Sequence, residues 1–119
     1  MSPVIVARDG VPVLAIGSPG GRTIINTVLQ VILNMIDFKM NIAQAVEAPR
    51  FHHQWMPDVT RIERMGFSLD TQRLYQEMGH AIEFRDIQGR AMGVYHDPVD
   101  GLYYGAADSR AKDGAVIGY

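Results

Sequence analysis

Cysteine is absent from this sequence of 119 residues, and neither sign of charge predominates. Without cysteine the chain has no disulfides, no zinc–thiolate sites and no thiol nucleophile. The 13 acidic and 11 basic residues give a formal net charge of -2 with no clustered run of either sign, so neither nucleic acid nor an anionic membrane is expected as a partner. No apolar run reaches the roughly 18 residues of a membrane span.

Low-complexity tracts, internal repeats and linkers are also missing, so we interpret residues 1–119 as a single segment. Hydrophobic residues make up 47% of the chain and charged residues 20%, which is typical of a globular domain. Met1 is followed by Ser-Pro-Val rather than by a basic stretch and an apolar run, so any export signal is expected to lie elsewhere.

The first residues predict a β-hairpin. Residues 4–7 and 13–16 are short apolar runs, and the Asp9-Gly10 pair between them is a strong turn signal. Neither run alternates with polar residues, which is typical of strands that are covered on both faces. The hairpin is therefore expected to lie in the middle of a layered fold.

Two helices are expected after the hairpin. Residues 23–37 carry apolar side chains on nearly every face of a helix, which predicts a buried helix. Asn41 is a good N-cap for a second, short helix, which should stop at Ala48 because Pro49 disfavours helical geometry in the residue before it. The charged side chain of Glu47 should face outward.

The rest of the sequence predicts more strands around one further helix. Ser68 should begin that helix and Gly79 should end it. Extended segments are expected at residues 50–55, 60–63, 81–84, 91–96 and 102–106, the last two joined by a turn at residues 97–101. This order of strands, helices and strands predicts an α+β fold.

The segment Gly17-Ser18-Pro19-Gly20-Gly21 lies where a strand gives way to the long helix. Helix N-termini leave N–H groups unpaired, the macrodipole adds positive charge there, and adjacent glycines let a ligand approach the backbone. Such a turn can bind phosphate, can form an oxyanion hole, or can simply connect a strand to a helix. The phosphate interpretation is disfavoured because Gly21-Arg22-Thr23 does not match the end of a P-loop.

Several segments together resemble the C-terminal part of the γ-glutamyltranspeptidase family, nearly along the whole chain. They are Ser2-Pro3, Gly17-Ser18-Pro19-Gly20-Gly21, Thr27-Val28-Leu29-Gln30, Ala48-Pro49-Arg50-Phe51-His52-His53-Gln54-Trp55 and Gly105-Ala106-Ala107-Asp108-Ser109-Arg110.

The resemblance implies an N-terminal-nucleophile hydrolase with the four-layer αββα sandwich. In that family a precursor cleaves itself, and the freed threonine attacks the γ-glutamyl amide of glutathione or a related compound. The backbone N–H groups of Gly20 and Gly21 would then form the oxyanion hole and contact the substrate. The family commonly has Ser-Arg after these glycines, whereas this chain has Arg22-Thr23, which puts the local side-chain contacts in question but not the backbone donors.

The resemblance also implies what lies outside this chain. The nucleophile-bearing part of the small subunit is expected upstream of Met1, and the partners would be that part, the large subunit of the same precursor and a γ-glutamyl substrate. No metal or organic cofactor is implied. Location would be periplasmic or secreted. The isolated chain is expected to be inactive, because backbone donors without a nucleophile form no acyl-enzyme, and to self-associate through open strand edges.

Other candidate residues favour structural roles. Neighbours on a strand point to opposite faces, so His52 and His53 are not expected to chelate one metal ion. Asp108 and Arg110 should pair with each other, and Asp97 and Asp100 should shape a turn rather than bind calcium. Two other functions remain open: an acylase of glutaryl or cephalosporin amides, and a non-catalytic domain that binds an anion or a partner at the Gly20-Gly21 turn.

Overall fold

A computed structural model describes residues 2–118 and divides the chain into two compact units. The first unit joins Met1–Ala48 to Gly89–Tyr119, and the second is Pro49–Gln88. The chain therefore leaves the first unit after Ala48 and returns to it at Gly89. No helix within residues 2–118 is long and apolar enough to cross a membrane.

A four-stranded antiparallel sheet forms one layer of the first unit. Its strands are β1 (Val4–Arg8), β2 (Val11–Gly17), β6 (Met92–His96) and β7 (Tyr103–Ala107), in the order β1-β2-β6-β7. Asp9 and Gly10 have φ angles of 51° and 81°, the left-handed geometry that a tight hairpin turn requires. The predicted hairpin is confirmed.

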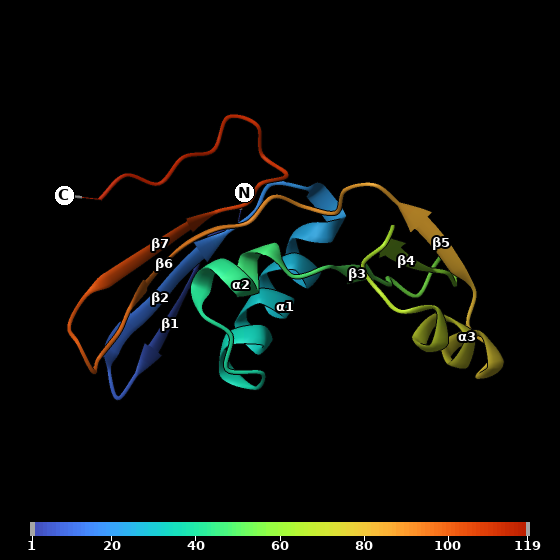
Figure 1. The fold of residues 1–119 in the computed structure, drawn as a ribbon, viewed down its shortest axis with the longest axis horizontal. Helices are drawn as coiled ribbons and strands as arrows, with labels where there is room; N and C mark the ends of the chain where they lie inside the picture. The colour runs from blue at the N-terminus through green and yellow to red at the C-terminus, as the bar shows by residue number, and fades with distance from the viewer. Residues whose placement is uncertain (1, 119) are drawn as a thin grey trace. The chain divides into compact units, whose positions relative to one another are not determined.

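Helices cover one face of this sheet (Figure 1). The short 3₁₀ helix η1 (Gly21–Thr23) leads into α1 (Ile24–Ile36), and α2 (Ile42–Glu47) follows. Asn41 caps α2 as predicted, in a reciprocal capping box with Gln44, and the helix ends before Ala48. The core lies between the helices and the sheet and is formed by Leu14, Ile16, Val28, Val31, Ile42, Ala45, Val46, Ala91 and Ala106.

Two faces that the sequence predicts to be buried are exposed within residues 2–118. Ile5 of the hairpin is 67% exposed, and Ile25 of α1 is 75% exposed. Only Thr27, Val28 and Val31 of α1 are buried. Among residues 2–118 of the first unit, one layer of helices packs on one face of one sheet, so each layer keeps an apolar outer surface.

The second unit is a small mixed sheet with one helix. Its strands β3 (Phe51–His52), β4 (Thr60–Glu63) and β5 (Ile82–Arg85) lie in the order β3-β4-β5, with β3 antiparallel and β5 parallel to β4. The helix α3 (Leu69–Glu77) makes the crossover between the two parallel strands. Ser68 caps it by accepting a hydrogen bond from the Thr71 N–H, as predicted.

A buried polar network ties together the two ends of the second unit. The Glu63 carboxylate accepts hydrogen bonds from the N–H of Arg50 and the N–H of Gln88, at 3.0 and 2.9 Å. The Gln88 side chain donates to the carbonyl oxygens of Arg50 and Arg61, and the Arg50 guanidinium donates to the Gln88 carbonyl. Since Arg50 and Gln88 stand at the two ends of this unit, Glu63 holds the incoming and outgoing chain side by side.

Candidate functional site

The Gly17–Gly21 loop is the candidate site, and it follows β2 directly. Gly20 has φ 141° and ψ 9°, and Gly21 has φ 57°, conformations that glycine adopts without steric cost. The 3₁₀ helix η1 then begins at Gly21 and continues into α1. The sequence therefore places two glycines with left-handed geometry at the N-terminus of a long helix.

The N–H groups of Gly20 and Gly21 are available to a ligand. Both residues are exposed, and no acceptor within residues 2–118 takes a hydrogen bond from either N–H. The start of a helix carries a partial positive charge from its aligned peptide dipoles. Two adjacent donors at such a position suit a negatively charged oxygen.

Three hydroxyl-bearing residues lie at or near the loop. Ser18 is fully buried, and its Oγ donates to the Pro19 carbonyl at 2.7 Å and accepts from the Arg90 N–H at 3.1 Å. Thr23 Oγ1 and the Thr23 N–H both donate to the Gly20 carbonyl, at 3.0 and 3.2 Å. Thr27 lies beneath the loop, against Gly89.

Sequence reasoning did not find these supporting residues. Ser18 belongs to the Gly17–Gly21 segment, but nothing in the sequence assigns a role to its side chain, and no motif singles out Gly89 or Arg90. Arg90 is 72 positions from Ser18 along the chain, so only the folded chain brings them together. The one local signal is Thr23, which stands where the family commonly has arginine. It is three residues from Gly20, whose carbonyl its hydroxyl contacts.

The other candidate residues have structural roles. The predicted pair of Asp108 and Arg110 is confirmed, with 3.0 Å between Asp108 Oδ1 and Arg110 Nη1. Arg110 also donates to the carbonyl oxygens of Val46, Glu47 and Ala48, and so caps the C-terminus of α2.

Asp97 and Asp100 shape the turn between β6 and β7, as predicted. Asp97 Oδ1 accepts from the Val99 N–H, and Asp100 Oδ1 accepts from the Leu102 N–H. The Tyr104 hydroxyl donates to Asp100 Oδ2 at 2.5 Å, and this hydrogen bond lowers the pKa of Asp100 and raises the pKa of Tyr104.

The adjacent histidines have separate partners. His52 is buried and its Nε2 contacts Gln54 Oε1, whereas His53 Nε2 lies 3.0 Å from Asp58 Oδ1. The Trp55 N–H donates to His53 Nδ1. Each imidazole therefore stabilises the loop after β3.

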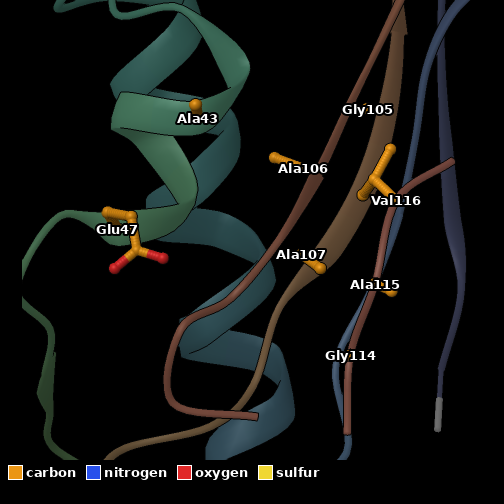
Figure 2. Close-up of a pocket in the computed structure, with 8 residues that line it drawn as sticks. All are labelled: Ala43, Glu47, Gly105, Ala106, Ala107, Gly114, Ala115 and Val116. Atoms are coloured by element: carbon orange, nitrogen blue, oxygen red, sulfur yellow. The ribbon is translucent and has the colours of Figure 1, made fainter. Parts of the chain in front are cut away.

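Two cavities of the first unit lie away from the glycine turn. One, of about 320 Å³, lies at the β7 edge of the sheet. Figure 2 shows Ala43 and Glu47 of α2 on one side of β7, and Gly114, Ala115 and Val116 on the other. The second, of about 930 Å³, lies between the hairpin β1-β2 and the end of α1. Neither is lined by Gly20 or Gly21.

Comparison by sequence and comparison by structure both match this chain to one protein family. Residues 1–119 match the model of the family described as Gamma-glutamyltranspeptidase. The "Glutathione hydrolase proenzyme" of Escherichia coli (strain K12) is 47% identical over 119 residues, which cover 100% of this chain and 20% of that protein. The "Glutathione hydrolase proenzyme" of Pseudomonas sp. (strain A14) is 42% identical over 127 residues, covering 100% of this chain and 22% of that protein.

A solved structure has the same fold. The crystal structure of a threonine-to-alanine mutant of Helicobacter pylori gamma-glutamyltranspeptidase superposes with a TM-score of 0.89 at 45% identity, covering 93% of this chain and 61% of that one. The α+β prediction is confirmed, and the sheet and helix layers of the first unit are part of the αββα sandwich of these enzymes. The chain spans about a fifth of the length of its curated relatives.

Proposed function

Because the chain belongs to the γ-glutamyltranspeptidase family, we propose that its Gly20 and Gly21 N–H groups form the oxyanion hole for γ-glutamyl transfer or hydrolysis. The observation that carries the proposal is the pair of adjacent N–H groups on two exposed glycines at the start of η1, which have no acceptor within residues 2–118. The substrate class comes from the curated relatives, among them the two glutathione hydrolase proenzymes named above.

The chemistry needs such a pair of donors. A threonine hydroxyl attacks the γ-carbonyl carbon of the substrate, and the carbonyl oxygen takes up negative charge in the tetrahedral intermediate. Two fixed N–H groups stabilise that charge, and the positive end of α1 adds to the stabilisation. Collapse of the intermediate breaks the amide bond, and the leaving nitrogen departs as an amine after gaining a proton. Water or an acceptor amine then takes the γ-glutamyl group.

The nucleophile in this proposal is supplied by another part of the same precursor. The chain spans about a fifth of its curated relatives, so the remainder of the small subunit and the large subunit would complete the site. The 119-residue chain alone is therefore expected to show no turnover, because a backbone donor pair cannot itself form an acyl-enzyme. Saturable hydrolysis by the pure chain would contradict this part of the proposal.

A single-atom change in the backbone tests the donors directly. In the mature full-length enzyme, replacing the amide nitrogen of Gly21 by an ester oxygen, through incorporation of glycolic acid, removes the N–H and keeps the glycine conformation. Hydrolysis of a chromogenic γ-glutamyl anilide should fall on the order of 10²- to 10³-fold in kcat, the usual cost of losing one oxyanion donor.

The matched control is the same ester at Gly10, another glycine with positive φ, in the turn between β1 and β2. This enzyme should keep its activity. Unchanged kcat in the Gly21 ester would overturn the assignment of the oxyanion hole, and absence of activity in the correctly matured, unsubstituted enzyme would overturn the assignment of the reaction.

A further inference from the structure

Each of the two peptide groups that carry a donor N–H has its carbonyl oxygen held by a hydroxyl. Pro19 O accepts from Ser18 Oγ, and Gly20 O accepts from Thr23 Oγ1. The first carbonyl belongs to the same peptide group as the Gly20 N–H, and the second to the same peptide group as the Gly21 N–H. The two hydroxyls therefore act on the two peptide groups that carry the candidate donors.

A trans peptide is planar, and its C=O and N–H bonds point in opposite directions. Neither the Pro19–Gly20 nor the Gly20–Gly21 peptide is cis. Fixing the direction of each carbonyl thus fixes the direction of the N–H on the opposite side of the plane. A hydrogen bond to the carbonyl oxygen also polarises the peptide and strengthens its N–H as a donor.

We propose that Ser18 and Thr23 are positioning residues that orient the Gly20 and Gly21 N–H groups, respectively. The proposal rests on the proposed function, in which these N–H groups bind the oxyanion. Glycine flexibility makes such support necessary, since two consecutive glycines with positive φ have many accessible conformations. Without the hydroxyls, each peptide plane would turn more freely about its neighbouring bonds.

Ser18 is itself held by Gly89 and Arg90, where the chain returns to the first unit. Its Oγ accepts the Arg90 N–H at 3.1 Å, so its own proton is directed to Pro19 O. Gly89 lets that segment come close: a Cβ there would lie 3.1 Å from Ser18 Oγ and 2.4 Å from Thr27 Oγ1. The hydroxyl of Ser18 therefore has one donor and one acceptor inside a closely packed site.

Thr23 is positioned just as closely. A Cβ on Gly20 would lie 2.6 Å from Thr23 Oγ1, so the hydroxyl occupies the space that the missing side chain leaves. The Thr23 N–H donates to the same carbonyl at 3.2 Å. Thr23 thus contributes two of the contacts that hold the Gly20–Gly21 peptide, one of which depends on its side chain.

The kinetic test uses Ser18→Ala and Thr23→Val in the full-length enzyme. A hydroxyl–carbonyl hydrogen bond contributes about 0.5–1.5 kcal/mol, so kcat should fall about 2- to 12-fold in each variant while KM stays nearly constant. Thr23→Ser keeps the hydroxyl and should keep kcat near that of the unsubstituted enzyme. Thr23→Ala removes the hydroxyl without putting a methyl group in its place, and it should behave like Thr23→Val. Unchanged kcat in both Ser18→Ala and Thr23→Val would overturn the proposal.

Ser68→Ala provides the matched control, since Ser68 also bonds the backbone through its hydroxyl but caps α3 in the second unit. It should lower the melting temperature and leave kcat unchanged. An equal fall of kcat in Ser68→Ala would show that loss of stability alone explains the effect.

A second readout does not depend on activity. With glycine-selective ¹⁵N labelling, Ser18→Ala should shift the amide signal of Gly20 more than that of Gly21, and Thr23→Val should do the reverse. Each amide nitrogen senses the hydrogen bond to the carbonyl of its own peptide group. Equal or absent shifts would overturn the positioning roles even if the enzyme were active, whereas selective shifts in an inactive enzyme would locate the failure in the proposed function.

Discussion

Gly89 lies so close to Thr27 that a Cβ at position 89 would be 2.4 Å from Thr27 Oγ1 and 2.9 Å from Thr27 Cγ2. Its φ of 69° is also one that side chains other than glycine rarely adopt. The return of the chain to the first unit thus passes directly beneath the candidate oxyanion loop, and only a glycine fits there.

The first prediction concerns this close approach. Gly89→Ala should lower the free energy of unfolding by about 2 kcal/mol or more, because overpacking and left-handed strain add. Urea denaturation measures the effect. Gly10→Ala, at a φ of 81° with no atom within 4 Å of the added Cβ, has the strain without the overpacking and should cost about 1–2 kcal/mol. Equal losses would show that packing against Thr27 contributes nothing.

The second prediction concerns the buried carboxylate of Asp108, which is 1% exposed. Its Oδ2 accepts the Ala91 N–H at 2.9 Å, and its Oδ1 pairs with Arg110. Asp108→Ala should lower the free energy of unfolding by about 3–5 kcal/mol. It leaves the Ala91 N–H without its acceptor and leaves the mostly buried Arg110 guanidinium with the more distant Glu47 carboxylate, at 4.0 Å.

Chemical denaturation of the variant tests this loss at neutral pH. Asp86→Ala is the control, because the Asp86 side chain is almost fully exposed and pairs with the exposed side chain of Arg64. A difference of less than about 1 kcal/mol between the two variants would contradict a structural role for Asp108, since surface pairs contribute about that much.

The third prediction concerns pH and the turn between β6 and β7. The hydrogen bond from Tyr104 lowers the pKa of Asp100 below its ordinary value of 3.8. The ionised carboxylate therefore stabilises the folded state above that ordinary value, and the contribution is lost as pH falls through the lower, folded-state pKa. Tyr104→Phe should move the pKa of Asp100 back toward 3.8, as measured by NMR titration.

The contribution of Tyr104 to stability has the opposite pH dependence, because it is lost as pH rises. The bond to Asp100 raises the pKa of Tyr104 above its ordinary value of 10.0, so the protonated phenol stabilises the fold below 10.0 and the contribution disappears as pH rises through the folded-state pKa. Asp100→Asn should lower the pKa of Tyr104, which absorbance of the phenolate reports. An unmoved phenol pKa would contradict the bond.

The fourth prediction concerns the apolar outer surfaces of the first unit. Ile5 lies in β1, an edge strand of the sheet, and Ile25 lies on the open side of α1. Unpaired strand edges and apolar patches promote association. The chain expressed alone should therefore give a light-scattering mass above that of one chain, and Ile5→Lys should reduce it. A monomeric mass for the unsubstituted chain would contradict the prediction.

The loop itself shows how far sequence reasoning reached. The strand, the turn and the helix around Gly20 and Gly21 were predicted, as were the caps at Asn41 and Ser68, and all are present. The oxyanion role of the glycines stays a prediction. The contact of Ser18 with Arg90 was not predictable, because no periodicity or motif connects two residues 72 positions apart.

The sequence by itself determined the local elements and the family. Turn residues such as Asp9 and Gly10, and capping residues such as Asn41, act on backbone groups within four positions, so their effects are written in neighbouring residues. The tertiary structure alone decided which side chains are buried and which distant residues hold the loop and the second unit in place. Ile25 is exposed, Glu63 joins the two ends of the second unit, and Ser18 meets Arg90, because burial and long-range hydrogen bonds depend on which segments pack together after the chain has folded.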